Sequence, residues 1–312
     1  MKNIGIFSLY GDFHTYIISN ELKNKFNTKA FIIEVDQLAG DETLSFYAND
    51  NNNNLLYLPD NNKIKVSVND LDRIWWRRRS KLQASAKKIA DESHKDFVNI
   101  ETFEALIGGI NNVFNGEWVN GITETDAASN KLIQMKTAKE CGFNLPKTIV
   151  TQNKIDLLNF VDGLNKSMIV KPMRGTRKAT LRAIKINKDD LKDDLDVTVC
   201  PTMYQEFIEG TQHFRVHCFG NNIITVLIET EEVDWRSLRN CRFSIYKLPY
   251  NIENKIYQFM KKMNLKMGVI DLKKSVDDEY FWLEINPQGQ FLFWEPLLDI
   301  NITEKFCDFI AN

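Results

Sequence analysis

Three oxygen-bearing side chains interrupt two apolar segments in the last fifth of the sequence. Asp271 lies within the apolar segment 268–272, and Glu284 and Asn286 lie within 282–287. A buried charge must be compensated, so acidic groups inside apolar strands favour a bound cation. Mg²⁺ takes carboxylate and amide oxygens and keeps water and phosphate oxygens as further ligands. We therefore predict a magnesium site, although a solvated sheet face with unpaired acids would give the same pattern.

A hairpin would bring these side chains together. If the two segments are antiparallel strands that turn at Asp277 and Asp278, Asp271 pairs directly with Glu284. Asn286 then shares the face of Glu284, because side chains alternate along a strand. Like charges opposite each other repel, so this register itself requires a neutralising group.

Magnesium held in this way implies phosphates, and phosphates require cations. Lys171 ends the apolar strand expected over 167–171, and Lys131 lies in a helix expected over 126–139. Arg215 stands in the middle of a further apolar strand. Each cation alone is typical of a protein surface. Together they are candidates for neutralising a triphosphate.

The order of these motifs resembles the ATP-grasp fold. The matching segments are Asn130-Lys131, Val170-Lys171-Pro172, Tyr204 to Gly210, Phe214-Arg215-Val216, Val269-Ile270-Asp271 and Leu283 to Pro287. The resemblance implies ATP and Mg²⁺ as cofactors, with Lys131 and Lys171 on the phosphates and with Asp271, Glu284 and Asn286 holding the metal. It also implies that a strand offers backbone groups to adenine and that Glu209 meets the ribose; the strand residues are Gln205, Glu206, Phe207 and Ile208.

Three further stretches are similar to the graspetide synthetases, the microviridin-type peptide ligases. They are residues 74–79, 234–236 and 286–293. Those enzymes phosphorylate an Asp or Glu side chain of a ribosomal precursor peptide, and a hydroxyl or amine of the same peptide then displaces phosphate to close an ester or amide macrocycle. Acyl phosphate formation develops charge on the transferring oxygens, so Arg215 and Arg236 are expected to stabilise the transition state.

The resemblance also implies peptide contacts. Asp193 and Asp194, in an acidic segment, are expected to bind the leader of the precursor, although a charge run is usually a solvated helix face. Arg77, Arg78 and Arg79 follow a strand expected over 71–76 and are expected to bind an acidic core peptide. The alternative is an aromatic core edge capped by solvated arginines.

Two other functions fit the same motifs. One is a ligase that adds a free amino acid to a protein or peptide, as the ribosomal-protein glutamate ligases do. The other is a regulatory module that binds nucleotide without turnover. The metal triad argues against the second, because binding alone tolerates the loss of a metal ligand more readily than catalysis does.

The elements that must position these residues indicate an α/β (α+β) protein. We expect an ATP-grasp fold with an N-terminal pre-ATP-grasp α/β domain over 1–115, a central domain over 116–199 and a C-terminal antiparallel-sheet domain over 200–312. Residues 290–293 are predicted to form the last strand of that C-terminal sheet.

Composition excludes several classes of protein. The 312 residues are 43% hydrophobic, which is too apolar for a disordered chain, and 40 basic residues nearly balance 42 acidic ones. A net charge of −2 gives no general attraction to nucleic acid or to an anionic membrane. No apolar run approaches the roughly 20 residues of a membrane span, and no signal peptide is evident. We therefore expect a cytoplasmic enzyme, which by its resemblance could form a homodimer.

Overall fold

The computed structural model describes residues 2–38, 43–48, 54–78, 82–164, 167–174, 182–191 and 197–312. The chain divides into two compact units. The first joins Met1–Ile122 to Gln290–Asn312, and the second is Thr123–Gly289. The second unit contains two separate antiparallel sheets. The division into three domains over 1–115, 116–199 and 200–312 stays a prediction.

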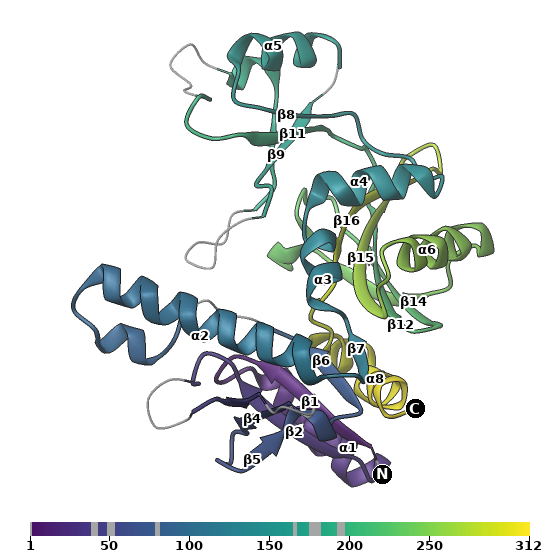
Figure 1. Ribbon diagram of the computed structural model, residues 1–312. Helices are drawn as coiled ribbons and strands as arrows, with labels where there is room; N and C mark the ends of the chain where they lie inside the picture. The colour runs from purple at the N-terminus through teal and green to yellow at the C-terminus, as the bar shows by residue number, and fades with distance from the viewer. Residues whose placement is uncertain are drawn as a thin grey trace. The chain divides into compact units, whose positions relative to one another are not determined.

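A parallel sheet forms the centre of the first unit (Figure 1). Its strand order is β2-β1-β6-β7, with bounds β1 (Asn3–Ser8), β2 (Lys29–Glu34), β6 (Arg73–Trp76) and β7 (Glu117–Val119). Because side chains alternate along β6, its two tryptophans go to opposite faces. Trp76 packs in the cluster that includes α2 (Glu92–Val113), whereas the Trp75 ring lies 4.7 Å from Phe306 of α8 (Ile302–Ala311). Helix α1 (Phe13–Phe26) contacts α8.

The remaining elements of this unit are short. A small antiparallel sheet consists of β3 (Ser45–Tyr47), β4 (Leu55–Pro59) and β5 (Lys65–Ser67), and the short helices are η1 (Val68–Asp70), η2 (Ser85–Lys88), η5 (Leu292–Trp294) and α7 (Glu295–Leu298). The strand predicted over 290–293 was wrong. Phe291 and Trp294 are both buried, and the Trp294 N–H donates to the Phe291 carbonyl. This spacing of three residues matches a 3₁₀ turn rather than the two-residue period of a strand.

The first sheet of the second unit has the order β10-β9-β11-β8. Its elements are β8 (Thr148–Thr151), α5 (Lys154–Asp162), β9 (Met168–Lys171), β10 (Ile184–Ile186), η3 (Lys188–Asp190) and β11 (Thr202–Glu206). Met168 and Tyr204 pack on one face against Leu157 of α5. Lys171 comes three positions after Met168, and Gln205 comes one position after Tyr204. Because side chains alternate along a strand, Lys171 and Gln205 lie on the opposite face.

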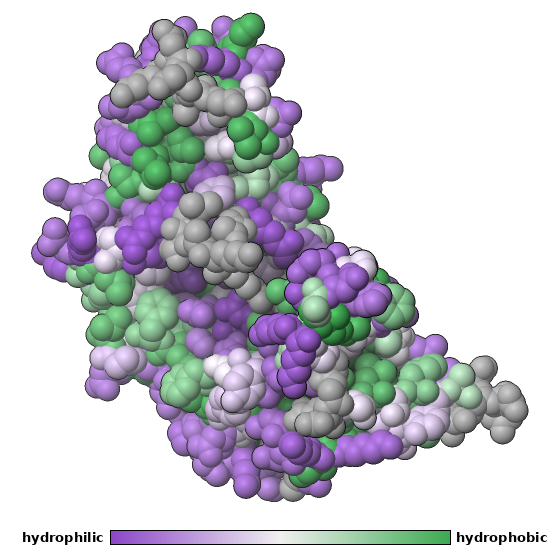
Figure 2. Space-filling model, turned by 90° about the vertical axis from the view of Figure 1, so that its left-hand side faces the viewer, coloured by the Kyte–Doolittle hydropathy of each residue, from purple (hydrophilic) through white to green (hydrophobic). Residues whose placement is uncertain are grey.

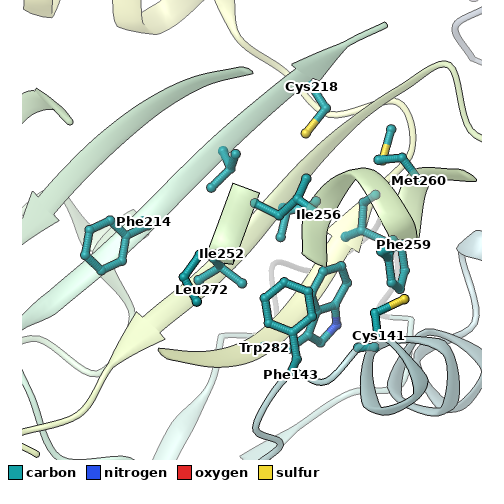
Figure 3. Packing of buried hydrophobic residues seen from close by; sticks show 14 of the residues in the cluster. Cys141, Phe143, Phe214, Cys218, Ile252, Ile256, Phe259, Met260, Leu272 and Trp282 are labelled. Carbon is teal, nitrogen blue, oxygen red and sulfur yellow. The ribbon is translucent and has the colours of Figure 1, made fainter. Parts of the chain in front are cut away.

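The second sheet of this unit has five antiparallel strands in the order β14-β13-β12-β15-β16. The bounds are β12 (Gln212–Phe219), β13 (Asn222–Glu229), η4 (Trp235–Ser237), β14 (Arg242–Tyr246), α6 (Tyr250–Lys262), β15 (Met267–Lys274) and β16 (Tyr280–Asn286). Helix α6 covers one face of the sheet. In Figure 3 its side chains point toward the sheet and lie near Leu272 and Trp282, and Phe214 of β12 belongs to the same core cluster. The polar side chains that alternate with these core residues are left for the other face.

The helix predicted over 126–139 is two helices, α3 (Ile122–Ala128) and α4 (Lys131–Glu140). Asn130 ends the continuity, because its side chain accepts hydrogen bonds from two backbone N–H groups in the first turn of α4, at 3.0 and 3.4 Å. Lys131 is therefore the first residue of a helix and not an interior one. From the start of α4, its side chain reaches Pro172 and Glu284.

The surface carries both hydrophilic and apolar residues. Hydrophilic residues cover much of the face in Figure 2, with smaller groups of apolar residues between them. Within the described ranges, no helix has the length and apolar character needed to cross a membrane.

Candidate active site

The hairpin of β15 and β16 has the predicted register at its acidic residues. Asp271 pairs with Glu284, and Val269 pairs with Asn286. The predicted pairing of Asp271 with Glu284 is therefore confirmed. A β-bulge follows, because Leu272 pairs with Trp282 and leaves Leu283 as the extra residue.

This bulge separates the core from the site. Glu284 and Trp282 are two residues apart and would share a face in a regular strand. The bulge instead turns Trp282 into the core, where it is 1% exposed and its ring lies 4.2 Å from Phe259. Glu284 stays opposite Asp271 on the other face. One short strand thus supplies a core anchor and a site carboxylate.

Arg215 lies directly opposite Asp271 on β12. One nitrogen of its guanidinium donates to both carboxylate oxygens, at 3.0 and 2.8 Å, and the guanidinium carbon lies 5.6 Å from the Trp235 ring. Arg236 forms a two-point ion pair with Asp234, at 2.7 and 2.5 Å. The side chain of Arg236 is 51% exposed, so its charge is accessible to a ligand.

Two lysines complete the charge cluster. The Lys131 Nζ lies 2.9 Å from Glu284 Oε2 and donates to the Pro172 carbonyl at 3.1 Å. Burial lowers the pKa of Lys171 to about 8, with Glu284 raising it and Lys131 lowering it further. The structure therefore brings together the predicted phosphate-binding lysines and a predicted metal ligand.

The two facing carboxylates differ in proton affinity. Burial raises the pKa of Asp271, and its neighbour Glu284 adds to the rise against the opposing effect of Arg215. Burial also acts to raise the pKa of Glu284, but Lys131 and Lys171 outweigh it and lower that pKa to about 2. Glu284 is thus an anion throughout the neutral range.

The donor set fits Mg²⁺. Two carboxylates and the Asn286 amide supply hard oxygen ligands on one sheet face, and the Asn286 Oδ1 is oriented by a 3.0 Å hydrogen bond from the Gln288 N–H. No group of three or more His, Cys, Asp or Glu side chains suited to a metal occurs in the part of the chain that the structure describes. A metal here would need phosphate oxygens or water to complete its ligands, as Mg²⁺ commonly does.

The predicted adenine strand is shorter than expected. Strand β11 ends at Glu206, and the Phe207 N–H donates to the Ser167 carbonyl at 3.0 Å. The Gln205 amide donates to Thr148 Oγ1 at 2.9 Å. Ile208 is buried, Glu206 and Phe207 are partly exposed, and Glu209 is exposed, so Glu209 can offer its side chain to a ligand here.

Sequence reasoning missed Lys273. This lysine shares the face of Asp271 and is 5% exposed; burial lowers its pKa to about 8, together with Lys185. Both ammonium groups approach the Phe207 ring, Lys273 at 4.7 Å and Lys185 at 4.1 Å from its centroid. The two-residue spacing from Asp271 was the signal that could have identified it.

The basic residues after β6 differ from one another. The Arg77 side chain is fully buried and burial lowers its pKa to about 9, so the alternative of solvated arginines does not hold at this position. Arg78 is 31% exposed. Both guanidinium groups approach Asp12 Oδ2, at 3.5 and 3.7 Å. Asp12 also caps α1, a role that its place between a strand and a helix could have predicted. Arg79, Asp193 and Asp194 lie outside the described residues.

Comparison with known proteins identifies the family. A profile described as a RimK-like ATP-grasp domain matches residues 128–310, which is more than half of the chain. The chain belongs to this family, whose enzymes use ATP and Mg²⁺. The predicted ATP-grasp fold is confirmed.

Individual proteins extend the comparison. An uncharacterized protein, MJ0776, of Methanocaldococcus jannaschii is 33% identical over 149 residues; these cover 47% of this chain and 37% of that protein, so the chain spans little more than a third of its relative. The macrocyclase MdnC of Microcystis aeruginosa MRC, bound with its precursor peptide MdnA, has a TM-score of 0.86 at 23% identity, over 99% of both chains. A RiPP-associated ATP-grasp ligase of Chryseobacterium gregarium, in complex with ADP and a leader and core peptide, also has a TM-score of 0.86, at 21% identity over 100% of this chain and 96% of that one.

Proposed function

We propose that the protein is an ATP- and Mg²⁺-dependent peptide ligase that joins side chains of a ribosomal precursor peptide through ester or amide bonds. The observation that carries this proposal is the paired Asp271 and Glu284, flanked by Lys131, Lys171 and Arg215. Such an arrangement suits the transfer of a phosphoryl group, where positioning and charge neutralisation supply most of the catalysis.

The reaction has two steps. An Asp or Glu carboxylate oxygen of the peptide attacks the γ-phosphorus of ATP, the bond to ADP breaks and an acyl phosphate forms. A hydroxyl or amine of the same peptide then attacks the acyl carbon, the bond to phosphate breaks, and the proton of the nucleophile passes to solvent. Lys131 and Lys171 bind phosphates, while Arg215 and Arg236 stabilise charge on the transferring oxygens. Mg²⁺, held by Asp271, Glu284 and Asn286, would neutralise the phosphate oxygens.

A peptide substrate is supported by the two similar ligases, which were solved with precursor or leader and core peptides. In the first unit of this chain, the guanidinium groups of Arg77 and Arg78 both approach Asp12 Oδ2. The Arg77 side chain is fully buried, whereas the Arg78 side chain is 31% exposed and its guanidinium group suits an acidic core peptide. Asp193 and Asp194 are proposed to bind the leader. A homodimer and a cytoplasmic location, where ATP is available, belong to the same proposal.

The test is a reconstitution with the candidate precursor. A small neighbouring reading frame that mixes Thr, Ser or Lys with Asp and Glu supplies the peptide, and the products are weighed by mass spectrometry after incubation with ATP and Mg²⁺. We expect the peptide to lose the mass of one water for each linkage. A gain in mass would indicate addition of amino acids instead, and an unchanged peptide would contradict the proposal.

The matched control is Glu284→Gln, which keeps the shape of the side chain and removes its charge. We expect this variant to fold, as judged by circular dichroism, and to lose at least about 100-fold in rate because a metal ligand is weakened. Full activity in Glu284→Gln would refute the assignment of Glu284 to the metal.

A further inference from the structure

The outer edge of β16 is closed by a side chain of α4. β16 is the last strand of its sheet, so backbone groups on its outer edge need partners from elsewhere. Gln134 supplies them at Ile285, where its Oε1 accepts from the Ile285 N–H at 2.9 Å and its Nε2 donates to the Ile285 carbonyl at 3.0 Å. Nε2 also donates to the Ala128 carbonyl at 2.7 Å. Gln134 is 2% exposed.

These hydrogen bonds require an amide. The Ile285 N–H needs an acceptor and the Ile285 carbonyl needs a donor, and the primary amide of Gln134 presents both. A buried backbone group left unpaired destabilises the folded state. The Gln134 side chain therefore links α4 to β16 by satisfying both backbone groups of Ile285, as a neighbouring strand would do.

The neighbouring contact lies at the nucleotide site. Lys131 precedes Gln134 by three residues and so lies on the same side of α4. Glu284 precedes Ile285 in β16. The helix and the strand thus meet at two adjacent links, Gln134 with Ile285 and Lys131 with Glu284, the latter at 2.9 Å.

We propose that Gln134 is a positioning residue of the nucleotide site. It fixes α4 against the edge of β16 so that the Lys131 ammonium and the Glu284 carboxylate meet in one geometry. Without it, α4 could shift along the strand, and both the lysine and the carboxylate would leave that geometry. The inference rests on the proposed function only in requiring that this site binds a nucleotide with Mg²⁺.

The experiment measures the affinity of the full chain for a fluorescent ADP analogue, with Mg²⁺ and with EDTA. Gln134→Met keeps the approximate volume of the side chain and removes all of its hydrogen bonds. We expect the gain in affinity that Mg²⁺ confers to fall about tenfold, as for other residues that orient metal ligands. The matched control is Thr137→Val, which removes a buried hydrogen bond to the Met263 sulfur from the same helix. Its Mg²⁺ response should equal that of the parent protein.

A double-mutant cycle with Lys131→Met separates positioning from general destabilisation. If Gln134 acts through Lys131 and Glu284, Gln134→Met should have little further effect once Lys131 is Met. Additive effects, or an equal loss in Thr137→Val, would overturn the proposal. If Gln134→Met does not fold, Gln134→Glu takes its place, since it keeps the acceptor for the Ile285 N–H and loses the amide donor.

No peptide is needed for these measurements, so the outcomes are distinguishable from those of the proposed function. Intact nucleotide binding without cross-linking would contradict the ligase proposal and leave the role of Gln134 standing. Cross-linking by the parent protein together with an additive cycle would contradict only the role of Gln134. A parent protein that does not bind the Mg²⁺ complex of the analogue would overturn both.

Discussion

The charge of Lys171 changes within the pH range of ordinary assays, because burial lowers its pKa to about 8. The ammonium form binds phosphate and the neutral amine does not. Since the folded-state pKa is lowered, charge on Lys171 is complete well below pH 8 and is lost as pH rises through it. We expect the affinity for ATP to fall up to about eightfold between about pH 7.5 and 9, as the charged fraction falls.

Lys171→Met tests the source of this dependence. The variant should bind ATP more weakly than the parent at pH 7.5 and should show a smaller decline toward pH 9, measured by calorimetric titration. The control is Lys23→Met on the exposed side of α1, which should retain the parent profile. An equally steep decline in Lys171→Met would contradict the assignment, and Lys273 would then be the titrating group to examine.

Single residues could be predicted from the sequence where a local rule applied. The pairing of Asp271 with Glu284 followed from the turn at 277–278 and the two-residue period of strands. The bulge at Leu283 could not be predicted, because the segment Phe281 to Leu283 is apolar throughout and has no alternation to break. The role of Gln134 depends on a partner 151 residues away and required the structure.

At the scale of elements, the site depends more on where a helix begins and ends than on whether a helix is present. One helix over 126–139 was predicted, and the break between α3 and α4 is what places Lys131 at a helix start. Asn130 is a favoured capping residue, so the sequence held the signal. The segment after β11 passes close to the backbone at the end of β15, and the sequence signalled this less clearly, through the single glycine Gly210.

Gly210 is expected to resist substitution. Its φ is +141°, and a Cβ at this position would lie 2.2 Å from the Lys274 carbonyl oxygen. Gly210→Ala should therefore lower the free energy of unfolding by about 2 to 4 kcal/mol, through backbone strain and a clash with the end of β15. Urea denaturation followed by circular dichroism measures the change.

Gly108→Ala is the control for this substitution. Gly108 lies in α2, where an added Cβ would meet no atom within 4 Å. Alanine should stabilise the helix there by up to about 1 kcal/mol. Similar effects at the two glycines would show that the strain at Gly210 is absent in solution.

At the scale of the whole molecule, the chain passes between the two units at Ile122–Thr123 and again at Gly289–Gln290. Hydrophobic periodicity can identify helix α8 but cannot say which unit it joins. The structure groups this last helix with Met1–Ile122 in the first unit, while the order of three consecutive domains stays a prediction. Long-range packing, not local pattern, decides that placement.

Phe306 tests this packing. It is 0% exposed, and its ring lies 4.7 Å from Trp75 and 5.1 Å from Phe291. Phe306→Ala should lower the stability of the first unit by about 3 to 5 kcal/mol. Hydrogen exchange read by mass spectrometry should show lost protection in β1 and α1, with β12 and β15 unchanged.

The control is Leu297→Ala in α7, where the side chain is 50% exposed and little should change. Equal loss of protection in both units after Phe306→Ala would mean that they unfold as one cooperative body.

The two crossing points also bear on how such a protein can diversify. Residues 123–289 form a continuous insertion that carries Lys131, Lys171, Asp271 and Glu284, whereas Arg77 and Arg78 belong to the surrounding sequence. Recombination at these two junctions would exchange the nucleotide-binding segment between relatives without dividing either set of buried clusters. The surrounding sequence, which holds Arg77 and Arg78, could then change its ligand while the nucleotide-binding segment is inherited unchanged.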